Sequence, residues 1–185
     1  NGQSCIASNR IYIQREKYDA YKAALSHRIS ELKVGDGLEE GVDIGPLVDD
    51  RALDSALHYI DQARTEGAEV VVGGGRLGER GNFLVPTLLA NVSRDARCYR
   101  EEIFAPIAAL YPFDTEEEVV GWANDTEYGL AAYVFTTDLN RAFRVSEALE
   151  AGTVGVNDPV PSTSNSPFGG FKQSGWGKRA GQRRH

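Results

Sequence analysis

The sequence predicts an α/β fold in three layers, a mainly parallel sheet with helices on both of its faces. Two observations carry this prediction. Helical and strand-like hydrophobic patterns alternate along most of the 185 residues. In addition, strand, helix and strand patterns follow one another within about 25 residues between Ala131 and Asn157, which is typical of a βαβ unit with parallel strands and a right-handed crossover. The length suits one domain with a single core rather than two small ones.

The elements of the first half follow from hydrophobic periodicity. Alternating apolar and polar residues predict a strand at 10–14, and apolar residues at steps of three and four predict a helix from Glu16 to about Leu32. The same helical spacing runs from Leu53 to Ala63, and Gly67 ends that helix. Further short apolar runs predict a buried strand followed by a turn within 69–75, and strands at 83–92 and 107–113. Within the run 83–92, Pro86 favours an edge position or a bulge.

The second half adds two capped helices. Thr115 and Glu118 predict a capping box for a helix through Ala123. Strands are expected at 131–137 and 152–157, and Asp138 caps the helix between them. The following stretch, up to 181, is rich in Gly, Ser and Pro and lacks periodicity, which is typical of functional or disordered segments. Its interleaved aromatic residues argue against disorder.

Composition excludes several classes of function. The net charge is −7 and basic residues are scattered until the C-terminal "KRAGQRRH", which is expected to be a solvated tail, so no nucleic-acid partner is expected. No apolar run is long enough to span a membrane, and no signal-peptide core is present. Two distant cysteines indicate free thiols and a reducing, cytoplasmic location, and three histidines make no metal-ligand spacing with them.

Cys5 is the candidate nucleophile. It precedes "IASNR", which is expected to form one helical turn, and a thiol at a helix N-terminus is a better nucleophile. The alternative is a buried, inert cysteine, which is the commonest state of a free cysteine. No pattern pairs Cys5 with a histidine, so a papain-like hydrolase has little support.

Seven motifs, taken in order, point to one family: "NGQSC", "IGPLVDD", "NFLVPTLL", "REEIFAPIAALYPF", "ANDTEYGLAAYVFTTD", "GTVGVN" and "SPFGGFKQSGWGKRAG". Together they resemble the catalytic, C-terminal half of the NAD(P)-dependent aldehyde dehydrogenases, nearest to the succinate-semialdehyde dehydrogenase branch. The resemblance implies that 1–181 form a catalytic domain and 182–185 a tail. It also implies that the cofactor-binding domain, a general-base Glu and an Asn that holds the oxyanion lie outside these residues.

The resemblance also implies roles for individual residues. Cys5 matches the family's nucleophile, whose attack on an aldehyde gives a thiohemiacetal that is held by the backbone N–H of Cys5. Glu102 matches the carboxylate that bonds the nicotinamide ribose, and Phe104 matches the aromatic residue beside the nicotinamide. Ala105 stands where the family usually has Gly, so strain is expected if that backbone needs a positive φ. Lys178 and Arg179 replace the family's Arg-Glu, with loss of an ion pair as the expected effect.

Three further residues are assigned to substrate binding by the resemblance. Asn157 and Phe168 match positions near the substrate tunnel, and Ser162 matches a serine that bonds the substrate carboxylate in the succinate-semialdehyde branch. The alternatives are a packing role for Phe168 and an ordinary loop position for Ser162.

The implied function is oxidation of an aldehyde to the carboxylic acid with NAD or NADP, by a full-length homo-oligomeric enzyme. Succinate semialdehyde is the candidate substrate, and the isolated chain is expected to be inactive. Three alternatives stay open: a non-enzymatic fragment or interaction module, a transferase that passes the acyl group to coenzyme A or phosphate, and an esterase activity of the thiol. The choice between NAD and NADP and the identity of the aldehyde stay open as well.

Overall fold

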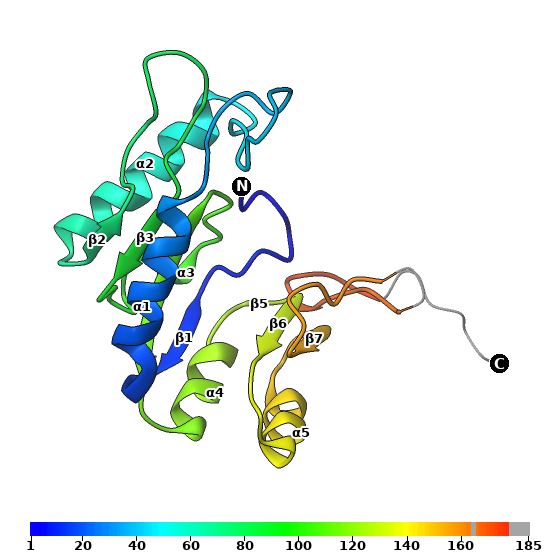
Figure 1. The fold of residues 1–185 in the computed structure, drawn as a ribbon. Coiled ribbons are helices and arrows are strands. Elements are labelled where there is room, and N and C mark those ends of the chain that lie inside the picture. The colour runs from blue at the N-terminus through cyan, green and yellow to red at the C-terminus, as the bar shows by residue number, and fades with distance from the viewer. Residues whose placement is uncertain (164–165, 178–185) are drawn as a thin grey trace. The chain divides into compact units, whose positions relative to one another are not determined.

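The computed structural model describes residues 1–163 and 166–177 (Figure 1). The chain divides into two compact units, the first ending at Phe113 and the second beginning at Asp114. The sequence led us to expect a single core. The difference arises because both clusters of buried apolar side chains involve only residues of the first unit. The assignment of 1–181 to one catalytic domain stays a prediction.

The first unit is built on a sheet of four strands. In spatial order these are β1 (Ile11–Gln14), β4 (Ile107–Phe113), β3 (Thr87–Ala90) and β2 (Glu69–Val72). The pairs β1–β4 and β4–β3 are parallel, whereas β2 runs antiparallel to β3. Of the two alternatives for the run around Pro86, the edge position is wrong, because β3 is an inner strand. It begins directly after the proline, so the ladder does not need the missing N–H. An irregularity does occur in the pairing of β3 with β2, where the register shifts between Val70 and Val72.

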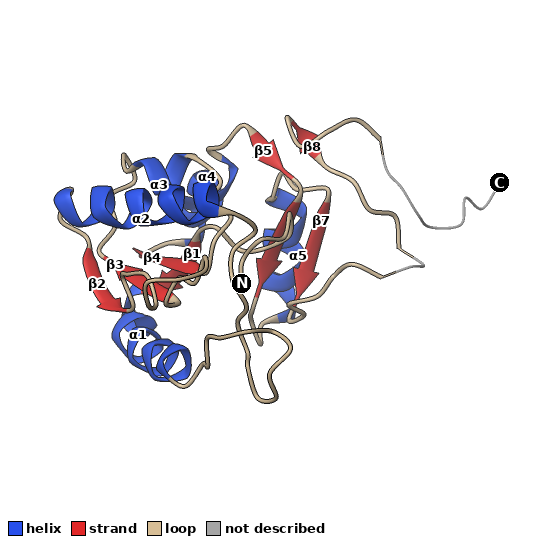
Figure 2. Cartoon of the chain, turned by 90° about the horizontal axis from the view of Figure 1, so that it is seen from above, coloured by secondary structure: helices blue, strands red, loops and turns tan. Residues whose placement is uncertain are grey.

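Helices cover both faces of this sheet, as predicted (Figure 2). One face packs against α1 (Arg15–Ser30), and the other packs against α2 (Asp50–Thr65) and the short α3 (Arg97–Arg100). The N-terminus of α2 is capped by Asp49, which accepts a hydrogen bond from the backbone N–H of Ala52 at 2.8 Å.

The two faces alternate along each strand because successive side chains in a strand point to opposite sides. Leu88 and Leu110 pack with Tyr18 of α1, whereas Leu89 and Tyr111 belong to the core beneath α2. The apolar runs of β3 and β4 are therefore buried on both faces, which is typical of a sheet covered by two helical layers.

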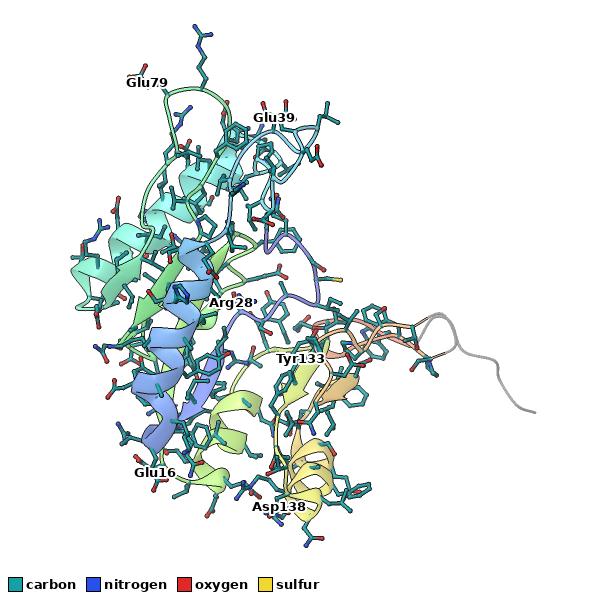
Figure 3. The ribbon with its side chains drawn as sticks, in the orientation of Figure 1. Glu16, Arg28, Glu39, Glu79, Tyr133 and Asp138 are labelled. Carbon is teal, nitrogen blue, oxygen red and sulfur yellow. The ribbon has the colours of Figure 1, made fainter. Side chains whose placement is uncertain are left out.

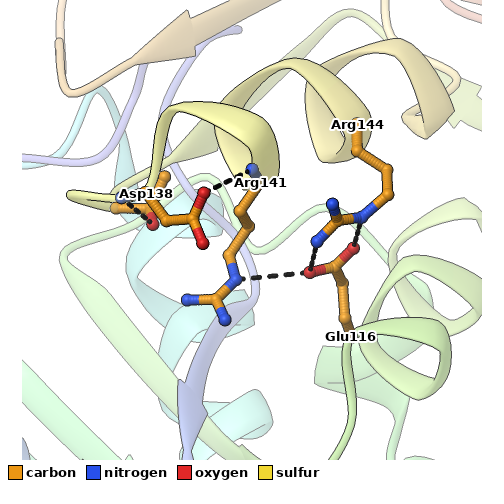
Figure 4. A network of polar contacts seen from close by, with 5 residues as sticks. Glu116, Asp138, Arg141 and Arg144 are labelled. Atoms are coloured by element: carbon orange, nitrogen blue, oxygen red, sulfur yellow. Dashed lines mark hydrogen bonds and ion pairs between the residues drawn. The ribbon is translucent and has the colours of Figure 1, made fainter.

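The second unit contains the predicted βαβ motif. β6 (Ala131–Val134) and β7 (Thr153–Val156) pair in parallel and are joined by α5 (Leu139–Ala148). Asp138 lies at the start of α5 (Figure 3). Its carboxylate accepts from the N–H of Arg141 at 3.0 Å (Figure 4). This hydrogen bond lowers the pKa of Asp138 below its ordinary value.

The remaining helix of the second unit is α4 (Glu116–Asn124). Thr115 accepts from the N–H of Glu118 as expected, but the Glu118 carboxylate accepts from the N–H of Asp114 rather than completing the reciprocal capping box. The Glu116 carboxylate joins α4 to α5 by ion pairs to Arg144 and Arg141 (Figure 4).

A short antiparallel pair completes the second unit. β5 (Tyr128–Gly129) pairs with β8 (Phe171–Lys172), so the Gly- and Ser-rich segment returns to the unit. The longest helices of the described residues, α1 and α2, have 16 residues each, and none of the described helices could span a bilayer.

Candidate functional site

Cys5 lies at the tip of a tight turn. The N–H of Ala7 donates to the carbonyl of Ser4 at 2.9 Å, which leaves Cys5 and Ile6 as the central residues. The expected helical turn does not form, and β1 begins soon afterwards. Cys5 is a free, exposed thiol. The buried, inert alternative describes Cys98 instead, where burial raises the pKa of the thiol.

The turn that bears Cys5 is fixed to a second segment through Gly2. This residue has φ of +76°, and a Cβ at its position would lie 2.1 Å from the carbonyl oxygen of Ala105. Only glycine satisfies both the left-handed backbone and this close approach. The backbone of the Cys5 loop therefore packs directly on the backbone of the segment that includes Glu102 and Phe104.

The "IGPLVDD" motif supports the same loop from another side. Asn1 donates from its side-chain amide to the carbonyl of Pro46 at 3.2 Å. Gln3 accepts from the N–H of Val48 at 3.2 Å. The residues that lead into the Cys5 turn are thus bound by a segment 45 positions away in sequence. This contact explains why the "IGPLVDD" motif occurs together with "NGQSC".

The two adjacent glutamates at 101 and 102 have different environments. The Glu101 carboxylate accepts from Arg97 at 2.6 Å and from the Tyr59 hydroxyl at 2.8 Å. Both hydrogen bonds lower the pKa of Glu101, and the bond from Arg97 has the larger effect. Glu102 is exposed, and no described residue forms a hydrogen bond or ion pair with its carboxylate. Glu101 is thus engaged within the fold, and Glu102 is free to meet a ligand.

The strained residue of this segment is Phe104, not Ala105. Phe104 has φ of +51°, and its side chain is 41% exposed. A left-handed conformation costs a non-glycine residue about 1–2 kcal/mol. Ala105 is buried and does not adopt positive φ, so the condition under which strain was expected at the Gly-to-Ala replacement is not met. Backbone strain of this kind clusters at active sites and ligand clamps.

A pocket of about 240 Å³ lies beside these two segments. One part of its lining is polar, with Ser4, Asn9 and Glu102, and another part is apolar, with Leu32 and Ala108 among the contributors. The pocket lining includes Phe104 but not Cys5, which stands next to Ser4 outside it. The concave surface is therefore associated with the predicted cofactor-binding residues.

Asn9 was not identified from the sequence. Its amide oxygen accepts from the N–H of Ile103 at 2.9 Å, and its amide nitrogen donates to the carbonyl of Glu101 at 2.9 Å. The only sequence signal is an asparagine in a turn just before a strand, a residue type that often bonds to backbone. The partners lie more than 90 positions away, so this signal could not name them.

The predicted substrate-binding residues belong to the second unit. Asn157 has φ of +54°, and its side-chain amide exchanges two 2.9 Å hydrogen bonds with the backbone of Thr136. These bonds extend the pairing of β6 and β7 by one step. Ser162 is exposed and Phe168 is half-buried. The roles of these three residues toward a substrate stay predictions.

Glycines allow close backbone approaches around β7 and the loop that bears Phe168. A Cβ at Gly152 would lie 1.7 Å from the carbonyl oxygen of Gly169, and a Cβ at Gly155 would lie 2.4 Å from that of Asp158. These close approaches account for Gly152 and Gly155 of "GTVGVN", and in "PFGG" a Cβ at Gly170 would lie 2.5 Å from the Cβ of Ser174. Lys178 and Arg179 lie outside the described residues.

Comparison with known proteins agrees with these observations. The profile of the Aldehyde dehydrogenase family matches residues 1–185. The chain is 46% identical to the NADP(+) succinate-semialdehyde dehydrogenase GabD of Escherichia coli, with 96% of the chain and 37% of that protein covered. It is 47% identical to a glutarate-semialdehyde dehydrogenase of Pseudomonas putida, again over 96% of the chain and 37% of that protein. The chain thus spans little more than a third of these relatives.

A solved structure shows the same fold. A crystal structure described as an E. coli NADP dependent enzyme superposes with a TM-score of 0.95 at 46% identity. The match covers 97% of this chain and 37% of that one.

Proposed function

We propose, since the chain belongs to the aldehyde dehydrogenase family, that the full-length polypeptide containing it oxidises an aldehyde to the carboxylic acid with NAD or NADP. One observation carries the assignment of roles. An exposed thiol at Cys5 stands on a turn that Gly2 fixes against the segment of Glu102, whose carboxylate has no partner among the described residues. The site thus offers a nucleophile and a free acceptor group on two segments whose backbones are in direct contact.

Cys5 supplies the covalent chemistry. Its thiolate sulfur forms a bond to the carbonyl carbon, and the π electrons move to oxygen to give a thiohemiacetal. Collapse of this adduct restores the carbonyl and expels hydride from the same carbon, which leaves a thioester on Cys5. Water then attacks the thioester, the C–S bond breaks, and the acid and the free thiol are released. The aldehyde carbon thus loses two electrons as hydride, and water supplies the oxygen of the acid.

Glu102 and Phe104 fit the cofactor chemically. A carboxylate accepts from two adjacent hydroxyls, which suits a ribose, and the Glu102 carboxylate is exposed beside the pocket. The Phe104 ring is exposed and offers a flat surface to a planar heterocycle. The cofactor, when bound, supplies the hydride acceptor. The chain spans about a third of its relatives, so we infer that turnover belongs to a polypeptide of full family length and that the 185 residues alone have little activity.

The proposed substrate class is an aldehyde that carries a carboxylate at its other end. The names of the relatives support this class, because they include succinate-, glutarate- and aspartate-semialdehyde dehydrogenases. Ser162 is the proposed donor to the substrate carboxylate, because its hydroxyl is exposed on the loop after β7. Asn157 and Phe168 are proposed to contact the substrate from the same unit. A homo-oligomeric assembly and a cytoplasmic location stay predictions.

Formation of reduced nicotinamide by the full-length protein tests this proposal. Succinate semialdehyde, glutarate semialdehyde and the uncharged butanal are compared, each with NAD+ and with NADP+. We expect kcat/KM for the semialdehydes to exceed that for butanal, and Ser162→Ala to reduce this preference by about tenfold. Ser55→Ala, at an exposed position on α2, is the control. Equal rates with butanal would contradict the substrate class, and no turnover with any pair would favour a non-enzymatic module.

A further inference from the structure

We propose that Asn9 is a positioning residue that holds Glu102 in place for the cofactor and joins the Glu102 segment to the Cys5 loop. This inference rests on the proposed function, because it assigns Glu102 a ligand. Asn9 follows Cys5 by four positions and lies two residues before β1, an element of the main sheet. Its backbone is therefore close in sequence to a strand of the first unit.

The hydrogen bonds of Asn9 lie on both sides of Glu102. The amide oxygen accepts from the N–H of Ile103, and the amide nitrogen donates to the carbonyls of Glu101 and Cys98 at 2.9 and 3.4 Å. Residues 101–106 are neither helix nor strand. No ladder holds this segment, so Asn9 takes the place that a neighbouring strand would have.

An amide is the side chain that meets both requirements. The segment presents one N–H donor and carbonyl acceptors, and an asparagine accepts and donates at a fixed separation. Aspartate would keep the bond from Ile103 but would set an oxygen against the carbonyl of Glu101. Leucine would leave both backbone groups without a partner.

The side chain of Glu101 completes the support. Tyr59 and Arg97 bind its carboxylate, while Asn9 binds the backbone on either side of Glu102. The segment is thus held through the two residues that flank Glu102, and the Glu102 carboxylate itself is left without a partner among the described residues at the pocket. The same asparagine connects this arrangement to the nucleophile turn, which Gly2 also fixes to Ala105.

The test is a double-mutant cycle in the full-length enzyme, with KM for NAD(P)+ and kcat measured separately. We expect Asn9→Leu and Asn9→Asp each to raise the cofactor KM about tenfold, while kcat at saturating cofactor changes less than about threefold. In the Glu102→Gln background, Asn9→Leu is expected to raise KM less than about twofold further, because both changes remove the same interaction. Thermal unfolding of each variant reports its folding, and Asn9→Asp, nearly isosteric, serves if Asn9→Leu does not fold.

Asn140→Asp and Asn140→Leu, at an exposed position on α5, are matched controls and are expected to leave both constants unchanged. An unchanged cofactor KM in both Asn9→Asp and Asn9→Leu would overturn the role of Asn9 and leave the proposed function standing. A tenfold rise in cofactor KM on adding Asn9→Leu to Glu102→Gln would do the same. A native protein that neither binds nor reduces NAD(P)+ would overturn the proposed function and this inference together.

Discussion

Substitution of Gly2 by alanine is predicted to separate the Cys5 loop from the Glu102 segment. The added Cβ would lie 2.1 Å from the carbonyl oxygen of Ala105, whereas real Cβ contacts essentially never fall below 3.0 Å. The two backbones must therefore move apart by about 1 Å or the turn must change its conformation. The positive φ of Gly2 adds a cost of about 1–2 kcal/mol for any residue that has a Cβ.

The larger effect is expected on catalysis rather than on stability. The Cys5 turn is exposed, so it can undock and relieve the strain without disrupting the core. A displacement of about 1 Å between reacting groups lowers the rate about a hundredfold. We therefore expect kcat/KM of the full-length Gly2→Ala enzyme to fall about a hundredfold, with a loss of unfolding free energy of no more than about 2 kcal/mol.

Steady-state formation of reduced nicotinamide measures this effect, and urea unfolding measures the stability. Gly37→Ala is the matched control, because no atom lies within 4 Å of its Cβ position and its φ is not positive. A Gly2→Ala enzyme that keeps kcat/KM within twofold of native would refute the claim that this contact sets the geometry of the site.

Three further predictions concern the core, the ion pairs and the second unit. Leu89→Ala, at a fully buried position of β3, should lower the free energy of unfolding in urea by about 2–5 kcal/mol. Leu38→Ala, at a side chain that is 96% exposed, should change it by less than about 0.5 kcal/mol. Similar losses of unfolding free energy in the two variants would contradict the assigned core. Arg144, and then Arg141, lower the pKa of Glu116, so its carboxylate stabilises the folded state above the ordinary Glu pKa and loses this effect as pH falls through the lowered value. Glu116→Gln should therefore be less stable than native at neutral pH and equal to it in acid, and a difference that does not depend on pH would argue against this ion pair. Gly152→Ala would bring a Cβ within 1.7 Å of the Gly169 carbonyl oxygen and should raise the aldehyde KM. Gly121→Ala, with no atom within 4 Å of its Cβ position, should leave the aldehyde KM unchanged. Equal KM values for the two variants would exclude a role in substrate binding for the loop that bears Phe168.

Elements with strong periodicity were predictable from the sequence because burial imposes that periodicity. The runs that became β3 and β4 are apolar except for the buried Thr87, since neighbouring residues such as Leu88 and Leu89 face opposite helical layers. The βαβ motif from Ala131 to Val156 was predictable for the same reason, together with the capping residue Asp138. The division into two units was not predictable, because no pattern in the sequence indicates that the clusters of buried side chains end at β4.

The fine geometry of the site depends on contacts that local patterns do not encode. The left-handed residue is Phe104, although a phenylalanine gives no sign of positive φ. The bonds of Asn9 reach partners 92 and 94 positions away. Glu102 was predicted from the family motif, but its distinction from Glu101 follows from Tyr59 and Arg97, which only the fold brings to that side chain.

The most direct test of the central claim compares the two cysteines of the chain in the full-length enzyme. Cys5→Ser should lower kcat with a semialdehyde and NAD(P)+ by at least about a thousandfold, because serine is a far weaker nucleophile than a thiolate. Cys98→Ala, which removes the buried thiol, should keep kcat within about threefold of native. Turnover that survives in Cys5→Ser, or that is lost in a folded Cys98→Ala enzyme, would contradict the assignment of Cys5 as the nucleophile.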